Sequence, residues 1–350
     1  MADIVALGCG LVGKFVVTKL AQRGYSVHVI DLTIPDSIKD NHSISYQEGN
    51  VFDILKYPPK AKVIVNLLPG NIGEQIRSTL ILNYRSIIDL AFTEIEPSIH
   101  NKLAIENDST LIWDVGIAPG LSNMLIRLES EIDENIKDVS IKVGGNPAIP
   151  DQDWSYMAPF SPADVIEEYT RPARIIVNGA TTTVSAISDL HRIEVDGYGT
   201  MEAFLTDGLR SLINSKMSPN MREYTVRWPG HIQKWIAEKE QLTDEELIDA
   251  WKFDEGTPEF TWMEVTIEYA EHKIIWEIVD NGLNGFSSMA RTTGLVTIAC
   301  VETLLVKTDT DGETIKFGVL APEDLPLDSI EQVIQYVKSE NVTIIRKLIE

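Results

Sequence analysis

Residues 3–13 read DIVALGCGLVG, an apolar segment followed at once by three glycines in the spacing G-x-G-x-x-G. The apolar part predicts a buried strand, and the residues after Gly10 predict an amphipathic helix. In this context Gly8 permits a tight turn, Gly10 lets a phosphate approach the backbone, and Gly13 allows the helix to lie close to the strand. The spacing alone is a weak signal, but its position predicts a dinucleotide-binding turn.

The acid that accompanies such a turn is expected about 20 residues further on, and Asp31 stands there at the end of a second apolar segment. A carboxylate at this point binds the ribose 2′-hydroxyl and repels a 2′-phosphate. No arginine follows at Leu32 or Thr33. We therefore predict NAD rather than NADP as the cofactor. The competing interpretation is a structural glycine turn followed by an unrelated surface acid.

Further cofactor contacts are expected at the start of the first helix and in the loops that end later strands. The N–H groups near Leu11 and Val12 should face the phosphates, because a helix N-terminus carries unpaired donors and a partial positive charge. Val51 and Asp53 follow the third strand, where side chains commonly flank adenine, and Leu67-Leu68-Pro69 follows the fourth. Each loop is equally consistent with an ordinary connection.

Up to about residue 125, short apolar segments alternate with amphipathic ones, which predicts an α/β Rossmann fold with a doubly wound parallel sheet. The expected strands are Asp3–Leu7, Val27–Asp31, Ser45–Gln47, Lys62–Asn66, Ser86–Leu90 and Thr110–Trp113. The expected helices include Leu11–Arg23, Glu74–Leu82 and Pro97–Asn107.

The pattern changes after about residue 130. Ser161-Pro162-Ala163-Asp164 combines an N-cap, a proline and an early acid, which predicts a helix through Tyr169. Asn178-Gly179 lies between two β-like segments and predicts a hairpin turn. Residues 263–269 alternate apolar and polar side chains before a partner strand at Lys273–Asp280. The middle region is therefore expected to be an inserted α+β domain built on a mostly antiparallel sheet.

Small and apolar residues from Ser288 through Thr303 predict a helix that returns to the first domain. We therefore expect a split NAD-binding Rossmann domain made of residues 1–128 and 285–350. Residues 129–284 would form the inserted substrate-binding and dimerisation domain. The role of the segment after Leu325 is left open.

Composition excludes several classes of partner. The chain has 53 acidic and 30 basic residues, a formal charge of −23, which argues against nucleic acid as a partner. The six histidines are scattered, and Cys9 and Cys300 stand in unrelated contexts, so we predict neither a metal site nor a disulfide. No apolar run approaches the roughly 18–20 residues of a membrane span, and the first residues lack the basic flank of a signal peptide. A cytoplasmic protein without a membrane partner is expected.

Longer motifs identify a family. Residues 113–125 read WDVGIAPGLSNML. Further motifs are VGGNP at 143–147, SPADVIEEYTRPARIIVNG at 161–179, GYGTMEAFLTDGLRSL at 197–212, TVRWPGH at 225–231 and SSMARTTG at 287–294. In combination, over roughly residues 1–325, the chain resembles the saccharopine dehydrogenase superfamily, and specifically its lysine 6-dehydrogenase-like branch.

The resemblance implies a Rossmann domain with an inserted substrate domain, usually in a homodimer, acting on an amino acid with NAD. Lysine 6-dehydrogenases oxidise the ε-amine carbon of L-lysine, and the resulting imine hydrolyses to a semialdehyde and ammonia. Saccharopine-handling relatives typically carry an acid where this chain has Ala118, and a different pair at Ser122-Asn123, which favours the lysine-type branch. Asn146 departs from the apolar residue of the family pattern, which puts the shape of the pocket in doubt.

Two alternatives remain. The first is a saccharopine-type reductase that joins or splits a secondary amine. The second is a non-catalytic NAD-binding sensor that kept the fold and lost the chemistry, since function resides in sites rather than folds.

Oxidation of an amine-bearing carbon needs a proton acceptor and anchors for the substrate's charged groups. Arg227 suits capture of a carboxylate, and the His231 imidazole ordinarily titrates near neutral pH. Glu168, followed by Tyr169, is a candidate partner for an ammonium group. Two more candidates, Asn123 and Asp89, follow or end strands at the carboxyl edge of the sheet, where ligands of such folds bind.

Each candidate also has a structural interpretation. Arg227 would then be an ordinary strand-face or dimer-interface arginine, and His231 a capping or buried histidine. Glu168 would be a solvated acid, and Asn123 with its neighbour Ser122 would cap the helix that follows.

Overall fold

The computed structural model describes residues 2–309 and 315–350 of the chain. These residues form two compact units. The first unit comprises Met1–Leu121 and Thr293–Glu340, and the second comprises Ser122–Thr292 and Asn341–Glu350. The chain therefore leaves the first unit, builds the second, and returns through one long helix.

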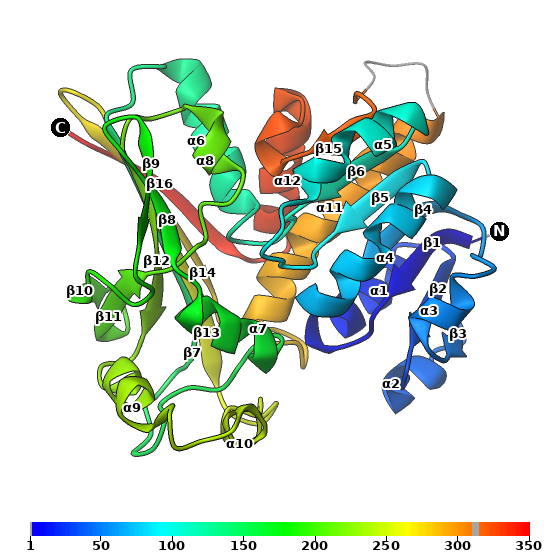
Figure 1. Ribbon diagram of the computed structural model, residues 1–350, viewed down its shortest axis with the longest axis horizontal. Coiled ribbons are helices and arrows are strands. Elements are labelled where there is room, and N and C mark those ends of the chain that lie inside the picture. Colours follow the sequence, from blue (N-terminus) through cyan, green and yellow to red (C-terminus); the bar gives the residue numbers. More distant parts are fainter. Residues whose placement is uncertain (1, 310–314) are drawn as a thin grey trace. The chain divides into compact units, whose positions relative to one another are not determined.

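A parallel sheet organises the first unit (Figure 1). Its strands are β1 (Ala2–Leu7), β2 (Val27–Asp31), β3 (Ile44–Glu48), β4 (Ala61–Asn66), β5 (Ser86–Asp89), β6 (Thr110–Trp113) and β15 (Gly318–Leu320). The order is β15-β6-β5-β4-β1-β2-β3, and every pair is parallel. The chain adds strands on one side of β1 and then on the other, so the order reverses between β1 and β4. Ligands of doubly wound folds bind at this switch point.

The helices of the first unit cover a sheet whose central strands are largely apolar. They are α1 (Leu11–Gln22), α2 (Asp36–Lys39), α3 (Val51–Ile54), α4 (Gly70–Asn83), α5 (Asn101–Glu106), α12 (Leu327–Ser339) and the 3₁₀ turns η1 (Pro97–His100) and η2 (Pro322–Asp324). Central strand residues such as Val5, Ile64 and Ile87 are completely buried, as a sheet covered on both faces requires. The predicted doubly wound fold is confirmed, and β2 and β6 have the expected bounds.

The expected returning helix is α11, Ser288–Asp309. Its segment Ser288–Val306 has 19 residues and a mean hydropathy of 1.4, so by length and composition alone it could cross a membrane. The sequence did not indicate such a segment, because Arg291 and Glu302 interrupt its apolar residues. Of the apolar window, 78% is buried inside the protein, as in a core helix.

A mixed sheet forms the core of the second unit. Its strands are β7 (Asp138–Pro147), β8 (Ala173–Val177), β9 (Ala180–Val184), β10 (His191–Val195), β11 (Gly199–Leu205), β12 (Met221–Arg227), β13 (Glu259–Glu268), β14 (Lys273–Asp280) and β16 (Thr343–Ile349). The main order is β10-β11-β12-β7-β13-β14-β16, while β8 pairs with β12 and β9. All pairs are antiparallel except β7 with β12. The mostly antiparallel sheet predicted for this region is confirmed.

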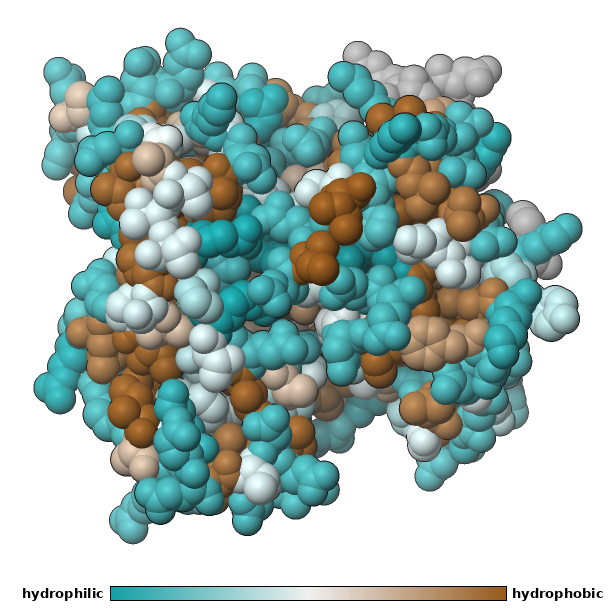
Figure 2. All heavy atoms as spheres, in the orientation of Figure 1, coloured by the Kyte–Doolittle hydropathy of each residue, from teal (hydrophilic) through white to brown (hydrophobic). Residues whose placement is uncertain are grey.

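Short helices flank this sheet. They are α6 (Leu121–Ile132, whose first residue belongs to the first unit), α7 (Pro162–Thr170), α8 (Leu212–Ser215), α9 (His231–Glu238) and α10 (Asp244–Ala250). The predicted cap is present, because the Asp164 N–H donates to Ser161 Oγ at 3.4 Å. Aromatic side chains, among them Trp154, Tyr169 and Trp251, pack into one buried cluster beside these helices. The face drawn in Figure 2 is largely hydrophilic, with apolar residues in separate patches.

The last strand lies where the sequence did not indicate. We expected residues 341–350 in the first domain, but β16 pairs with β14 in the second sheet. Glu129 of α6 is buried, and its Oε1 accepts hydrogen bonds from Arg346 Nε at 2.7 Å and Trp276 Nε1 at 2.8 Å. These contacts fix the final strand to its own unit.

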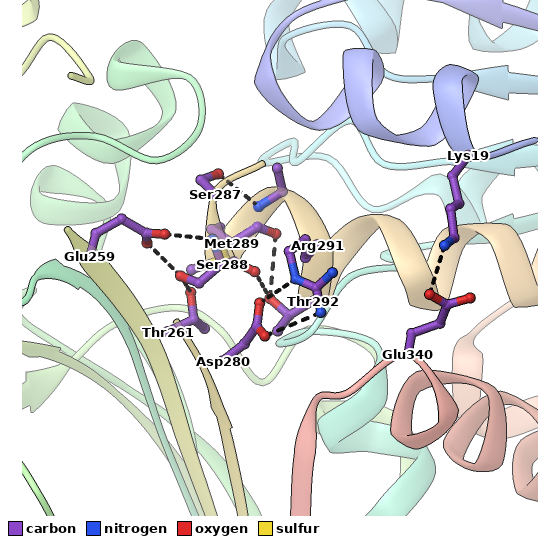
Figure 3. Close-up of polar contacts among 11 residues, drawn as sticks. Lys19, Glu259, Thr261, Asp280, Ser287, Ser288, Met289, Arg291, Thr292 and Glu340 are labelled. Carbon is purple, nitrogen blue, oxygen red and sulfur yellow. Dashed lines mark hydrogen bonds and ion pairs between the residues drawn. The ribbon is translucent and has the colours of Figure 1, made fainter. Parts of the chain in front are cut away.

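The SSMARTTG motif begins α11 and ties it to the second sheet (Figure 3). Ser288 Oγ lies 2.5 Å from Glu259 Oε2 and 2.7 Å from Thr261 Oγ1. Arg291 Nε donates to Asp280 Oδ2 at 2.8 Å, and both side chains of this pair are buried. This part of the family motif therefore has an anchoring role.

Figure 3 also shows the Lys19–Glu340 ion pair of the first unit.

Candidate functional site

The glycine turn follows β1 at the switch point of the first sheet. Gly8 has a φ of 98°, and a Cβ there would lie 2.8 Å from the Leu67 carbonyl oxygen. A Cβ at Gly13 would lie 2.5 Å from the Gly8 carbonyl oxygen. Among the described atoms, a Cβ at Gly10 would meet nothing within 4 Å. Two glycines are thus required by backbone packing, and the backbone at the third is open to an approaching group.

The start of α1 and the carboxylate of Asp31 lie beside this turn. Among the described residues, no side chain caps α1 and none in its first turn is acidic, so its N-terminal N–H groups keep their partial positive charge. Asp31 Oδ2 accepts a hydrogen bond from the Cys9 N–H at 2.5 Å. The Asp31 carboxylate is therefore held against the turn. An open backbone, helix donors and an oriented carboxylate fit a pyrophosphate with its ribose.

The other predicted cofactor residues have different surroundings. The Leu67 backbone contacts the turn, and Pro69 precedes the first residue of α4. The Leu68 N–H donates to Asn66 Oδ1 at 3.4 Å. Val51 is buried at the start of α3, whereas the Asp53 carboxylate is 70% exposed and pairs with Lys56 at 2.7 Å. The structure therefore brings Leu67 to the glycine turn, and the cofactor contacts of this group stay predictions.

Asp89 is held by a buried network. Its Oδ2 accepts from Arg77 Nε at 2.6 Å, and its Oδ1 accepts from Asn66 Nδ2 at 2.9 Å and from the Ala91 N–H at 3.0 Å. Both members of the Arg77–Asp89 pair are completely buried. These contacts fix the turn after β5 to α4. We therefore infer a structural role for Asp89, and a role in catalysis for this residue stays a prediction.

Most of the predicted catalytic side chains meet in the second unit. Glu168 and Tyr169 come from α7, Arg227 ends β12, and His231 begins α9. Arg227 Nε donates to Tyr169 Oη at 2.7 Å, and the Glu168 carboxylate lies 3.9 Å from the guanidinium. The guanidinium also lies over the ring of Tyr156, 4.5 Å from its centroid. We call these five side chains the arginine cluster.

Hydrogen bonds fix the proton positions in this cluster. His231 Nδ1 lies 2.9 Å from the Trp154 carbonyl oxygen, which can only accept, so Nδ1 carries the proton. The unprotonated Nε2 then accepts from Tyr169 Oη at 3.0 Å. The same phenol oxygen accepts from Arg227. A directed chain thus runs from Arg227 through Tyr169 to His231.

Burial changes the expected role of His231. The side chain is 1% exposed, and burial lowers the pKa of His231 to about 3, with the charges of Arg227 and Lys234 acting in the same direction. The expectation that this imidazole titrates near neutral pH therefore does not hold. Burial also raises the pKa of Tyr169 well above its usual value, although Arg227 opposes that shift. Near neutral pH both groups are neutral, and they orient Arg227.

Glu168 is the accessible acid of the arginine cluster. Its side chain is 18% exposed, against 4% for Arg227. Glu168 Oε1 accepts a hydrogen bond from Thr225 Oγ1. The cluster thus presents a partly exposed carboxylate next to a buried guanidinium.

Asn123 has contacts with other residues of the second unit. It is fully buried, its Nδ2 donates to Ser211 Oγ at 3.0 Å, and its Oδ1 accepts from Ser122 Oγ at 3.0 Å. A role in catalysis for Asn123 stays a prediction.

Three residues in or beside the arginine cluster were not identified from the sequence. They are Tyr156, which lies under the guanidinium, Thr225, which contacts Glu168, and Glu223, which lies on the same strand as Arg227. A signal for the last two was present, because Glu223, Thr225 and Arg227 alternate with apolar or aromatic residues along β12 and therefore share one face. Among the described residues, no group of three or more His, Cys, Asp or Glu side chains is arranged to hold a metal ion.

Comparison with known proteins identifies the family. Residues 116–342 match the family described as saccharopine dehydrogenase C-terminal domain. The fold is similar to that of apo saccharopine dehydrogenase (L-Glu forming) from Saccharomyces cerevisiae, with a TM-score of 0.76, 15% identity and coverage of 100% of both chains. It is also similar to homospermidine synthase from Legionella pneumophila in complex with NAD, with a TM-score of 0.74, 12% identity, and coverage of 99% of this chain and 91% of that one.

A curated relative is alpha-aminoadipic semialdehyde synthase from Arabidopsis thaliana, 23% identical over 151 residues. The match covers 41% of this chain and 14% of that protein, so the chain spans only a small part of its length. The family match, in contrast, extends over more than half of this chain. The protein is therefore a member of the saccharopine dehydrogenase C-terminal domain family, and its first unit has a Rossmann-type fold.

Proposed function

We propose that this protein is an NAD-dependent oxidoreductase that oxidises the ε-amine carbon of L-lysine, as lysine 6-dehydrogenases do. The observation that carries the proposal is the arginine cluster. Arg227 is buried and donates to the phenols of Tyr169 and Tyr156 and to the Val226 carbonyl, and among the described residues its ion pair is with Glu168 at 3.9 Å. A buried cation needs a well-placed anion. The α-carboxylate of an amino acid would supply it, and the adjacent Glu168 would pair with the α-ammonium.

The first unit would hold NAD through its glycine turn. The backbone at Gly10 and the N–H groups near Leu11 and Val12 would bind the pyrophosphate, and Asp31 would bind the ribose hydroxyl. When bound, NAD accepts a hydride from the substrate carbon. The NAD in the related Legionella structure supports this assignment.

The chain's own residues would bind and orient the amino acid. Tyr169 and His231 hold the guanidinium in one orientation, so the substrate carboxylate meets a fixed pair of donors. The neutral ε-amine loses a hydride from its carbon to the bound cofactor and a proton from its nitrogen to water, which leaves an imine. Addition of water to that imine releases ammonia and leaves a semialdehyde.

A second candidate is oxidation of the secondary amine of saccharopine. It is supported by the fold shared over the whole length with the yeast saccharopine dehydrogenase. The two candidates differ in their products. With NAD and L-lysine, the first predicts one ammonia for each NADH. Formation of NADH from saccharopine without ammonia would favour the second, and NAD binding without turnover of either amino acid would favour a sensor.

The proposal also includes a homodimer, which rests on the resemblance to lysine 6-dehydrogenases, and a cytoplasmic location, which rests on the sequence pattern alone. The formal charge of −23 supports the absence of a nucleic-acid partner. Domain boundaries at residues 128 and 285, with NAD binding on residues 1–128 and on the segment from 285 to 340, remain part of the proposal, whereas residues 341–350 belong to the second unit.

Asp31→Ser should weaken NAD binding and reduce the preference for NAD over NADP. Loss of hydrogen bonds to a charged acceptor costs about 1.5–3 kcal/mol, or roughly 10- to 150-fold in Kd. NADP should lose less affinity because the repulsion of its 2′-phosphate disappears as well. Calorimetric titration with both cofactors measures the two effects. Asp36→Ser, at an exposed acid of α2, is the matched control. Equal Kd values for NAD in the two variants would contradict the assignment.

A further inference from the structure

A line of hydrogen bonds joins Glu168 to a second, buried acid. Glu223 Oε2 lies 2.6 Å from Thr206 Oγ1, and Thr206 Oγ1 lies 2.8 Å from Thr225 Oγ1. Thr225 Oγ1 in turn contacts Glu168 Oε1. Thr206, Glu223 and Thr225 are all buried, and only the Glu168 end of the line is partly exposed.

The fold places these groups by strand register and by a glycine. Leu205, the last residue of β11, pairs with Tyr224 of β12, and the N–H of the next residue, Thr206, donates to the Glu223 carbonyl at 3.3 Å. A Cβ at Gly208 would lie 2.4 Å from the carboxyl carbon of Glu223. The missing side chain at Gly208 therefore makes room for this carboxyl group.

The number of protons in this line of hydrogen bonds determines how many of its two carboxyl groups are ionised. Three oxygen–oxygen contacts need three protons, and the two threonine hydroxyls supply only two. The third proton must belong to one of the two carboxyl groups. If Glu223 carries it, Glu223 donates to Thr206, Thr206 to Thr225, and Thr225 to an ionised Glu168. The reverse order leaves Glu168 protonated and Glu223 ionised.

We propose that Glu168 and Glu223 share one proton through the hydroxyls of Thr206 and Thr225, so that Glu168 is ionised whenever Glu223 is protonated. Conversion between the two arrangements moves one proton across each contact and leaves the total number unchanged. The shared proton makes Glu223 a positioning residue, an assignment that rests on the proposed function. Glu223 stores the proton so that Glu168 can face the substrate ammonium with a negative charge.

The surroundings favour a proton on Glu223. Burial raises the pKa of Glu223 to about 8, and the negative charges of Glu168 and Asp207 add to the effect. Asp207 is paired with Arg174 at 2.9 Å, and Arg171 lies 4.0 Å from it. Arg227 faces Glu168 at the other end of the line. These three cations thus lie beside Asp207 and Glu168, whereas the Glu223 carboxyl group has hydrogen bonds with Thr206 and with the backbone at Gly208.

The first test needs no substrate. Infrared difference spectra between neutral pH and a pH above 8 should show loss of the carbonyl stretching band of a protonated carboxylic acid in the wild-type protein. Glu223→Gln should lack this band, because the amide replaces the protonated acid in the same hydrogen bond. Glu277→Gln, at an acid paired with Lys347, should retain it. Absence of the band from the wild type, or its persistence in Glu223→Gln, would overturn the proposal.

The second test removes the Thr206 hydroxyl, which connects Glu223 to Thr225 in the line of hydrogen bonds. In the wild type, one pH midpoint should govern both the infrared band and the KM for L-lysine. In Thr206→Val the two midpoints should separate by about one pH unit or more, because coupled sites titrate as a pair only while they interact. A uniform fall in kcat/KM with coincident midpoints would indicate a merely structural role and overturn the proposal. If L-lysine is not a substrate, the infrared result still decides whether the proton is present.

Discussion

Asp89→Ala is expected to lower the free energy of unfolding by about 3–5 kcal/mol, because it leaves the Arg77 guanidinium buried without its anion. Both side chains have 0% exposure, and the guanidinium meets the carboxylate at 2.6 Å. Asn66 and the Ala91 N–H lose the same acceptor. Urea denaturation measures the loss directly.

Two controls separate the buried charge from a general effect of mutation. Lys56→Ala removes one member of an ion pair that is 66% and 70% exposed, and it should change stability by at most about 1 kcal/mol. The double variant Arg77→Met/Asp89→Leu should be more stable than Asp89→Ala, since it removes both charges. If Asp89→Ala is no more destabilised than Lys56→Ala, the structural role of Asp89 is wrong.

Arg227→Met is expected to reduce kcat/KM for the amino-acid substrate roughly 30- to 4,000-fold. This factor corresponds to a loss of about 2–5 kcal/mol in the free energy with which the enzyme binds the transition state. The variant removes the donors proposed for the substrate carboxylate. Arg227→Lys should recover only part of the loss, because an ammonium group cannot bind a carboxylate with a planar fork. Affinity for NAD should be unchanged. Steady-state kinetics and calorimetric titration with NAD measure these quantities.

Arg222→Met is the matched control for this experiment. Arg222 lies on the same strand, pairs with Asp138, and has a side chain that is 32% exposed. Its loss should leave kcat/KM close to the wild-type value. Equal kinetic constants for the two variants would exclude Arg227 from the substrate site. A melting temperature lowered in Arg227→Met without any kinetic change would have the same meaning.

Features encoded by neighbouring residues were predictable from the sequence. The glycine turn, the Ser161 cap and the Asn178-Gly179 hairpin each depend on a few consecutive residues, and all three are present. Pairing over long distances was not predictable. β15 pairs with β6, which lies some two hundred residues earlier in the chain, and β16 pairs with β14. The partner of such an edge strand depends on which strands are already paired in the sheet and not on neighbouring residues in the sequence.

Properties that arise from burial were also beyond the sequence. The histidine in TVRWPGH suggests a titrating imidazole, but its pKa depends on aromatic rings and a guanidinium that approach only after folding. Glu223 was overlooked for a related reason, since nothing adjacent to it in the sequence indicates Thr206 or Gly208 as a contact. The alternation along β12 identifies the strand face on which Glu223 lies. The number of protons shared between Glu223 and Glu168 follows only from hydrogen bonds that the three-dimensional structure shows.

Transfer of deuterium from C6 of L-lysine tests the central claim most directly. With L-lysine carrying two deuterium atoms at C6 and unlabelled NAD, we predict one deuterium in each reduced cofactor and one ammonia released with it. Mass spectrometry of the isolated cofactor gives the answer. Reduced cofactor without deuterium, or absence of turnover by protein that binds NAD, would contradict oxidation of the ε-amine carbon.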